Sequence, residues 1–171
     1  MSIRSVILVA TATVIACAQP QPGIAAGMPV HLPASDLFIE TADGRRHGFR
    51  VRVAASPRDR GRGLMRVTDL PEDKGMLFDF EDQAMVSMWM KNTPLSLDMI
   101  FILDDGRISS IAEATTPFSR RSIQSEEPVR AVLEIGGGLS ERLNIRPGDQ
   151  VIHALFAVTP VDDGGDSISG S

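Results

Sequence analysis

Two Asp-Gly pairs, at 43–44 and 105–106, constrain the fold of this chain more than any other feature. Each pair lies between apolar, β-branched runs, and Asp-Gly in that setting is the turn signal of a β-hairpin. The first pair separates 37–41 from 45–54, where apolar residues alternate with arginine. That alternation is typical of a strand with one buried and one wet face. The chain is therefore expected to build antiparallel hairpins.

The other apolar runs are equally short and are separated by turn residues. Strands are predicted at 75–80, 86–92, 97–103, 107–115, 129–135 and 151–158. One short helix is expected after Ser56, which has capping spacing to Asp59, and a second in 136–144. No βαβ alternation indicates a parallel sheet. The predicted fold class is mainly β, a compact antiparallel β sandwich or closed barrel with two short helices.

Residues 1–18 have the pattern of a bacterial export signal. Arg4 supplies the positive start, and the apolar run 5–16 is too short to span a bilayer comfortably. Cys17, the only cysteine, ends "VIAC", which resembles the lipobox of bacterial lipoproteins. Lipidation would cap a lone thiol in an oxidising compartment. We expect a periplasmic protein anchored to the membrane through Cys17, while "ACA" ending at Ala18 leaves a soluble periplasmic form as the alternative.

The expected domain organisation follows from these signals. It comprises a signal peptide at 1–18, a flexible tether at 19–35, a β-rich domain at 36–159 and a disordered tail at 160–171. The chain of 171 residues is long enough for one domain with a sizeable core. Its net charge of −5 opposes a generic nucleic-acid binder, so no nucleic-acid partner is expected.

Several motifs occur in an order that resembles a known prokaryotic family. They are "RGRGLM", "LPEDKGMLFDF", "WMKNTPLSLDMIFI", "DGRI", "VRAVLEIGGG" and "IRPGD". Over roughly 37–158 the chain resembles the domain of unknown function 192 family. This resemblance implies a compact β-rich fold and frequent export, but no established reaction. Family members usually carry an aromatic and then a basic residue after "GLM", where this chain has Arg66 and Val67, so it implies no contact through those side chains.

The predicted strand around "MWM" carries the candidate ligand site. Trp89 and Lys91 share one face of such a strand, and Asn92 stands at its end. An aromatic platform beside a cation and an amide suits a sugar ring or a carboxylate-bearing ligand. Asp98 or Glu134 is expected to pair with Lys91 and orient it. In the structural alternative, Trp89 is core and the stem of Lys91 covers it.

Two other patterns have weaker functional interpretations. Thioethers select Cu(I), and the chain is rich in methionine at 65, 76, 85, 88, 90 and 99. However, Met88 and Met90 have core spacing and the histidines are isolated, so no metal or other cofactor is expected. The glycines of "EIGGGLSERL" expose N–H groups that suit an anion, although a conformational role is favoured.

Four arginines, at 58, 60, 62 and 66, form a local basic cluster within an acidic protein. Such a cluster suits lipid phosphates or anionic polysaccharide. A solvated face is the simpler interpretation, and it is favoured.

The sequence offers little for catalysis. It contains no Ser-His-Asp signature, nucleophile elbow or zinc motif. It therefore favours a binding module for a small polar ligand or an envelope component. One alternative is a hydrolase on cell-envelope glycans that uses Asp98 and Glu134 as its carboxylate pair. The other is a purely structural envelope module.

Overall fold

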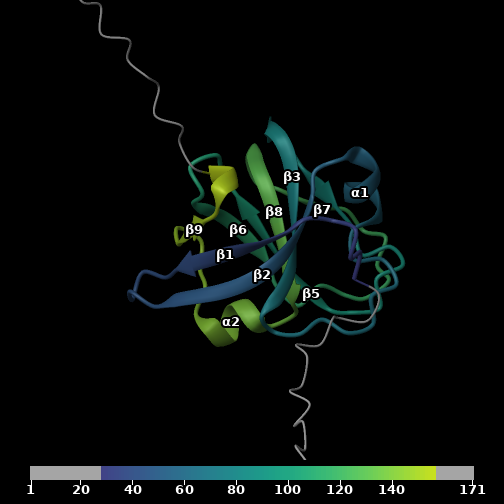
Figure 1. The fold of residues 1–171 in the computed structure, drawn as a ribbon, viewed down its shortest axis with the longest axis horizontal. Coiled ribbons are helices and arrows are strands. Elements are labelled where there is room, and N and C mark those ends of the chain that lie inside the picture. The colour runs from purple at the N-terminus through teal and green to yellow at the C-terminus, as the bar shows by residue number, and fades with distance from the viewer. Residues whose placement is uncertain (1–27, 157–171) are drawn as a thin grey trace, which may run out of the picture.

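The computed structural model describes residues 28–156, so the expected signal, lipidation site and tail lie outside the described residues. Figure 1 shows the elements, which are β1 (Ala34–Glu40), β2 (Arg46–Ala54), α1 (Pro57–Arg62), β3 (Lys74–Ala84), β4 (Ser87–Met88), β5 (Leu97–Ile102), β6 (Ile108–Ala112), β7 (Ile123–Gln124), β8 (Val129–Gly136), α2 (Leu139–Leu143), β9 (Gln150–Ile152) and the 3-10 helix η1 (Ala154–Phe156).

The main sheet has seven strands in the order β6-β5-β8-β3-β2-β1-β9, and it curls into a half-barrel. A second, two-stranded sheet pairs β4 with β7. Both predicted hairpins are present, because β1 pairs with β2 and β5 with β6, each antiparallel. The predicted mainly β class with two short helices is confirmed.

One strand pair departs from the antiparallel prediction. β2 and β3 run parallel, and the chain returns between them through α1. Parallel neighbours require such a crossover. The short helix was predicted after Ser56, but a helix of six residues did not indicate a crossover between parallel strands.

The two edge strands of the sheet meet at one end. Arg107 forms an isolated antiparallel bridge with Gln150 beside the Asp-Gly turn. The Ile108 N–H donates to the Asp149 carbonyl at 2.9 Å, and the Val151 N–H donates to the Gly106 carbonyl at 2.8 Å. This junction of β6 with β9, called the seam below, holds the sheet in its curled shape.

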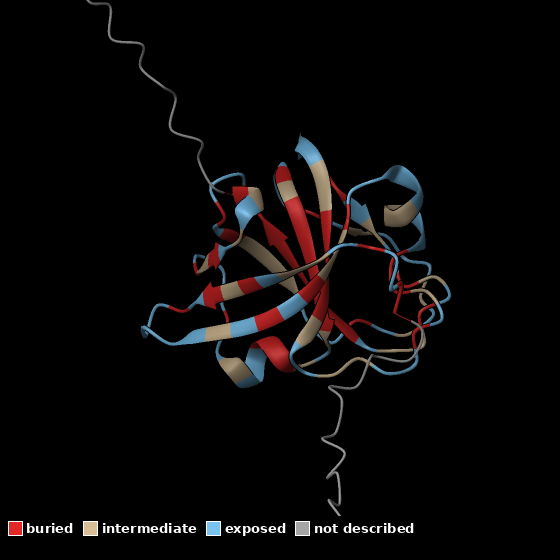
Figure 2. Cartoon of the chain, viewed as in Figure 1, coloured by how far each residue is buried: buried red, intermediate tan, exposed pale blue. Residues whose placement is uncertain are grey.

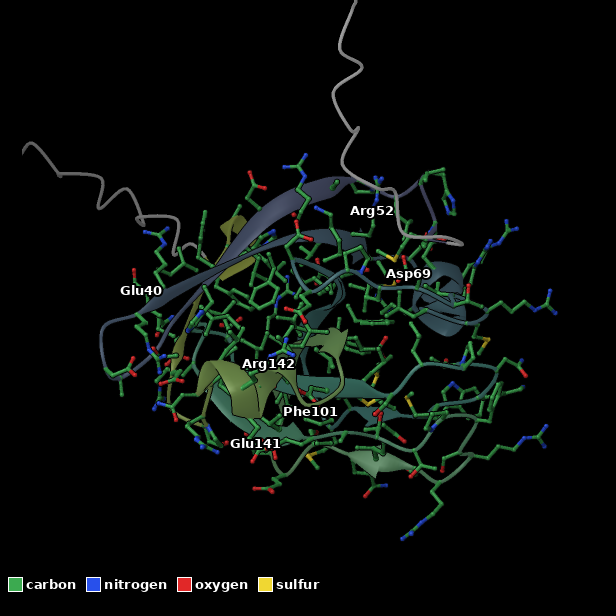
Figure 3. The ribbon with its side chains drawn as sticks, turned by 90° about the horizontal axis from the view of Figure 1, so that it is seen from below. Glu40, Arg52, Asp69, Phe101, Glu141 and Arg142 are labelled. Carbon is green, nitrogen blue, oxygen red and sulfur yellow. The ribbon has the colours of Figure 1, made fainter. Side chains whose placement is uncertain are left out.

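The central strands are largely buried (Figure 2), and Figure 3 shows the side chains between the elements, with Phe101 of β5 labelled. All six residues of β5 are buried. One apolar cluster includes Met76, Phe78 and Met99, while the other includes Leu77 and Ile100. Burial on both faces explains why these strands are uninterrupted apolar runs instead of alternating ones.

The predicted strand 86–92 is much shorter in the structure. Only Ser87–Met88 forms β4, and its partner β7 lies in a segment where no strand was predicted. The chain then turns at Asn92, which has the left-handed φ of 57°. Likewise, the predicted strand 151–158 gives way to η1 after Ile152.

The first described residues pack against the domain. Met28 and Leu32, within the expected tether, are buried in the core cluster of Met76 and Phe78. Within residues 28–156, no helix has the length and apolar character that a membrane span requires.

Candidate functional site

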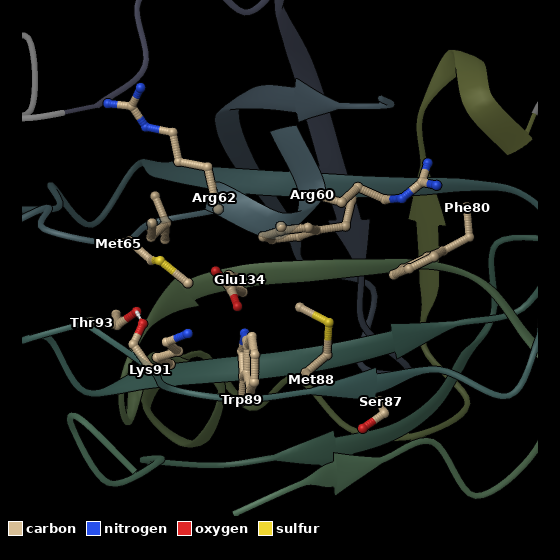
Figure 4. A pocket seen from close by; sticks show the side chains of 14 residues that line it. Arg60, Arg62, Met65, Phe80, Ser87, Met88, Trp89, Lys91, Thr93 and Glu134 are labelled. Atoms are coloured by element: carbon tan, nitrogen blue, oxygen red, sulfur yellow. Dashed lines mark hydrogen bonds between the residues drawn. The ribbon is translucent and has the colours of Figure 1, made fainter. Parts of the chain in front are cut away.

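An open pocket of about 240 Å³ lies between α1 with its following loop and the segment 87–93. Side chains of β3 and β8 contribute its floor. Figure 4 shows the residues that line it, which are Arg60, Gly61, Arg62, Gly63, Leu64, Met65, Phe78, Phe80, Ser87, Met88, Trp89, Lys91, Thr93 and Glu134. It is called the Trp89 pocket below.

Glu134 is a buried acid in the Trp89 pocket. It lies opposite Met76 of β3 and Met99 of β5, in the middle of the sheet, and only 4% of its surface is exposed. Burial raises the pKa of Glu134 to about 8, so the carboxyl is mostly protonated at pH 7. Within the described residues, its side chain forms neither a hydrogen bond nor an ion pair.

Trp89 and Lys91 line the pocket together, although they do not lie on a regular strand. Trp89 is 48% exposed, and the Lys91 ammonium lies 5.0 Å from the centre of its ring. This geometry is a cation–π contact. Lys91 forms no ion pair with any carboxylate of residues 28–156. The predicted pairing with Glu134 or Asp98 is therefore absent, and Trp89 is not core.

Asn92 lies beside the pocket without lining it. Its side-chain amide donates to the sulfur of Met65 at 3.8 Å, and its carbonyl accepts from the Arg66 N–H at 2.8 Å. Asparagine tolerates the left-handed conformation better than most residues. Asn92 therefore shapes the turn that brings Lys91 and the loop after α1 together.

Asp98 lies on the opposite face of the sheet from Glu134. It faces Ile135 across the β5–β8 pair, whereas Glu134 faces Met99, the next position along. Its buried carboxylate accepts hydrogen bonds from the backbone N–H groups of Ala114 at 2.7 Å, and of Gly138 and Ser140 at 2.8 Å each. The structure thus corrects the placement of Asp98 in the candidate site, and Asp98 and Glu134 do not flank a common substrate space.

The same contacts explain the glycines of "EIGGGLSERL". The N–H groups of Gly138 and Ser140, which suit an anion, bind the protein's own carboxylate. Gly138 has a left-handed φ of 78°. The glycine segment therefore has the conformational role that the sequence favoured.

Helix α1 forms one wall of the pocket and is held at both ends. The Asp59 N–H donates to the N-cap Ser56 hydroxyl at 3.1 Å. At the other end Gly63 has a φ of 46°, and a Cβ there would lie 3.0 Å from the Phe78 ring. Arg60 donates to the Ala55 carbonyl and to the Asp79 carbonyl, the latter at 2.7 Å.

Sequence reasoning missed several lining residues, including Met65, Phe78 and Phe80. Met65 lies in the "RGRGLM" motif, and Phe78 and Phe80 lie in "LPEDKGMLFDF", but neither motif by itself indicates a pocket. Phe80 lies under the Arg60 guanidinium, 5.2 Å from ring centre to carbon. The contribution of β3 to the pocket depends on the parallel β2–β3 crossover, which the sequence did not predict.

A serine and a histidine also meet away from this pocket. The Ser35 hydroxyl lies 2.8 Å from Nε2 of His153, and the Leu155 N–H donates to Nδ1 at 3.0 Å. Burial lowers the pKa of His153, so the ring is neutral and its proton sits on Nε2. His153 therefore donates to Ser35 and does not act as its base, which opposes a nucleophilic role.

The six methionines at 65, 76, 85, 88, 90 and 99 have different environments. Met65 and Met88 line the pocket, but Met76, Met90 and Met99 are fully buried and Met85 is exposed. Among residues 28–156, no three His, Cys, Asp or Glu side chains are grouped as a metal site requires.

A comparison with protein-family models identifies the family. The family model of DUF192, described as "Uncharacterized ACR", matches residues 38–153. A solved structure from Sinorhizobium meliloti 1021, described as a candidate transcription regulator, is 44% identical with a TM-score of 0.72, covering 72% of this chain and 96% of its own.

A second solved structure, from Novosphingobium aromaticivorans DSM 12444, is of a protein of unknown function. It is 35% identical with a TM-score of 0.70, covering 84% of this chain and 99% of its own. No curated protein matches the chain. The match over 38–153 confirms the resemblance drawn from the motifs, and this chain belongs to the domain of unknown function 192 family.

Proposed function

We propose that this protein is an exported, lipid-anchored domain that binds a small polar ligand in the Trp89 pocket. The observation that carries the proposal is Glu134, a buried carboxyl without a protein partner that borders an open pocket. Buried polar groups are normally hydrogen-bonded, because leaving one without a partner costs free energy. A ligand that hydrogen-bonds to this carboxyl from the pocket side accounts for an acid at this position.

Trp89 supports the same role. It is 48% exposed beside Lys91, and an aromatic ring with an adjacent cation is a common recognition element. A purely structural staple would need a paired Lys91 and a covered ring, and neither is found within residues 28–156. The pocket holds a single carboxyl group, so binding is better supported than two-carboxylate hydrolysis.

Trp89 is the only tryptophan of the chain, so its indole is a unique reporter of the pocket. The test is a titration of the full chain with neutral sugars, organic acids and organic amines, followed through the single indole N–H resonance. We expect a ligand to shift this resonance in a saturable way. Glu134→Gln and Lys91→Met should alter the shift, and Trp89→Phe should remove the resonance itself. Arg146→Met, which removes an exposed cation near α2, is the control and should leave binding unchanged.

The anchor is tested separately, because Cys17 lies outside the described residues. Membrane fractions should hold the wild-type protein, while Cys17→Ser should release it into the periplasmic fraction. A wild-type protein found only in the soluble fraction would contradict anchoring and leave the pocket proposal intact.

A further inference from the structure

We infer that the ligand of the Trp89 pocket is a small organic carboxylate, held between the Trp89 indole N–H, the Lys91 ammonium and the Glu134 carboxyl. This inference rests on the proposed function and names its ligand class. Figure 4 shows these three groups turned toward the same space.

Two of the three groups only donate hydrogen bonds. The indole N–H and the ammonium have no acceptor capacity, so their natural partner is an oxygen acceptor. Within the described residues neither of them donates to a protein acceptor, although Lys91 lies over the Trp89 ring. Because Lys91 is charged, an anionic oxygen binds more strongly there than a neutral one.

Glu134 complements a carboxylate only in its protonated form. A neutral carboxyl donates its O–H to a carboxylate oxygen, whereas an ionised one repels it. Burial raises the pKa of Glu134 to about 8, so the donor form prevails at pH 7. The other charged groups lining the pocket are cations, Arg60 and Arg62 from α1 and Lys91 from the segment after β4.

Within residues 28–156, further arginines without ion pairs belong to α1, to the loop after it and to the segment after Ser119. The Arg66 N–H donates to the Asn92 carbonyl, and the Met90 N–H donates to the Ser119 carbonyl, so the backbone at 66 and at 119 contacts residues next to those that line the pocket. Among the described residues, the ion pairs include none of Arg58, Arg62, Arg66, Lys91, Arg120 and Arg121. In a protein of net charge −5 this concentration of positive charge attracts anions.

The rest of the lining limits the ligand's body. Leu64, Met65, Phe78 and Met88 offer apolar contacts, and the volume of about 240 Å³ suits a small molecule. A ring or short apolar body bearing one carboxylate fits both properties. The positive charges of Arg60, Arg62 and Lys91 repel a cation, which opposes a Cu(I) ion bound by Met65 and Met88.

The test compares probes that share a ring and carry a negative, neutral or positive substituent. Two sets of probes are titrated into the full chain at pH 7 and pH 9. One set is cyclohexanecarboxylate, cyclohexanecarboxamide and cyclohexylamine, and the other is galacturonate, galactose and galactosamine. Trp89 fluorescence and the indole N–H resonance report binding. We expect the carboxylate of at least one set to bind at least tenfold more tightly than its neutral counterpart, and the amine of that set to bind most weakly.

The pH dependence identifies Glu134. The affinity for the carboxylate should fall about tenfold between pH 7 and pH 9 as Glu134 ionises. Glu134→Gln keeps an N–H donor without a titrating proton, so its affinity should be the same at both pH values. Lys91→Met should weaken the carboxylate at least tenfold and leave the neutral probe unchanged, and Arg146→Met should behave as wild type.

The outcomes separate the two proposals. Three outcomes would overturn the carboxylate inference while the pocket remains a binding site. They are equal binding of the carboxylate and the neutral probe, preferential binding of the amine, and tight binding of Ag(I) that Met65→Leu abolishes. If no probe of any charge moves the indole signal, the proposed function fails together with the inference.

Discussion

Glu134, the acid proposed to contact the ligand, lowers the free energy of unfolding when it ionises. Its pKa is about 8 in the folded protein against an ordinary value of 4.5. Between these pH values the folded state holds a proton that the unfolded chain has lost. The free energy of unfolding therefore falls as pH rises through this window, with no penalty below pH 4.5 and the full penalty above pH 8.

Replacing Glu134 by Gln should remove this penalty. The free energy of unfolding of Glu134→Gln, relative to wild type, should be about 4 kcal/mol higher at pH 9 than at pH 4.5. This figure takes roughly 1.4 kcal/mol for each unit by which the pKa is raised. Urea unfolding of both proteins across this range measures the difference. Parallel pH profiles for wild type and variant would contradict a buried, ionising carboxyl.

Asp98 is structural by comparison. Asp98→Asn replaces one of two accepting oxygens that together hold three backbone N–H groups. We expect the free energy of unfolding to fall by about 2–3 kcal/mol. Ser140→Ala is the matched control, because the buried Ser140 hydroxyl has no partner within residues 28–156 and its loss should be neutral or slightly stabilising. Urea unfolding distinguishes the two, and a neutral Asp98→Asn would refute the structural role.

At the scale of elements, α1 decides the shape of the pocket wall. Gly61→Ala adds a Cβ into open space within the helix, so it should stabilise the protein by up to about 1 kcal/mol. Gly63→Ala places a Cβ against Phe78 at a left-handed φ of 46°. We expect it to destabilise by about 1–3 kcal/mol and to shift the indole N–H resonance of Trp89. Equal effects of the two substitutions on unfolding and on the resonance would contradict this view of α1.

Local signals were sufficient for some elements and insufficient for others. The two hairpins were predictable because an Asp-Gly turn and its flanking strands are contiguous in sequence. The segment 86–92 was predicted as one strand, yet the main sheet leaves it no neighbour and β7 pairs with only two of its residues. Trp89 and Lys91 nevertheless meet, since the Lys91 ammonium lies 5.0 Å from the centre of the Trp89 ring.

For the molecule as a whole, the seam between β6 and β9 maintains the curl of the sheet. A Cβ at Gly106 would lie 2.6 Å from the Val151 carbonyl oxygen, so Gly106→Ala should push the seam apart. We expect a loss of about 2 kcal/mol or more of unfolding free energy and faster hydrogen exchange at Ile108 and Val151. Gly44→Ala is the control, because Gly44 also has a left-handed φ, of 80°, but its added Cβ would meet nothing. It should cost only about 1 kcal/mol and leave the hydrogen exchange of Ile108 and Val151 slow.

The sequence by itself determined the β-rich class, the hairpins, the family and the prominence of Trp89 and Lys91, because these depend on neighbours along the chain or on contiguous motifs. It did not determine which carboxylate accompanies Lys91. Asp98 and Glu134 are alike in sequence, each an acid within a largely apolar strand, but the β5–β8 register sends them to opposite faces. Only the tertiary structure decided that Glu134 borders the pocket and Asp98 is enclosed by backbone N–H groups, because register depends on partners distant in sequence.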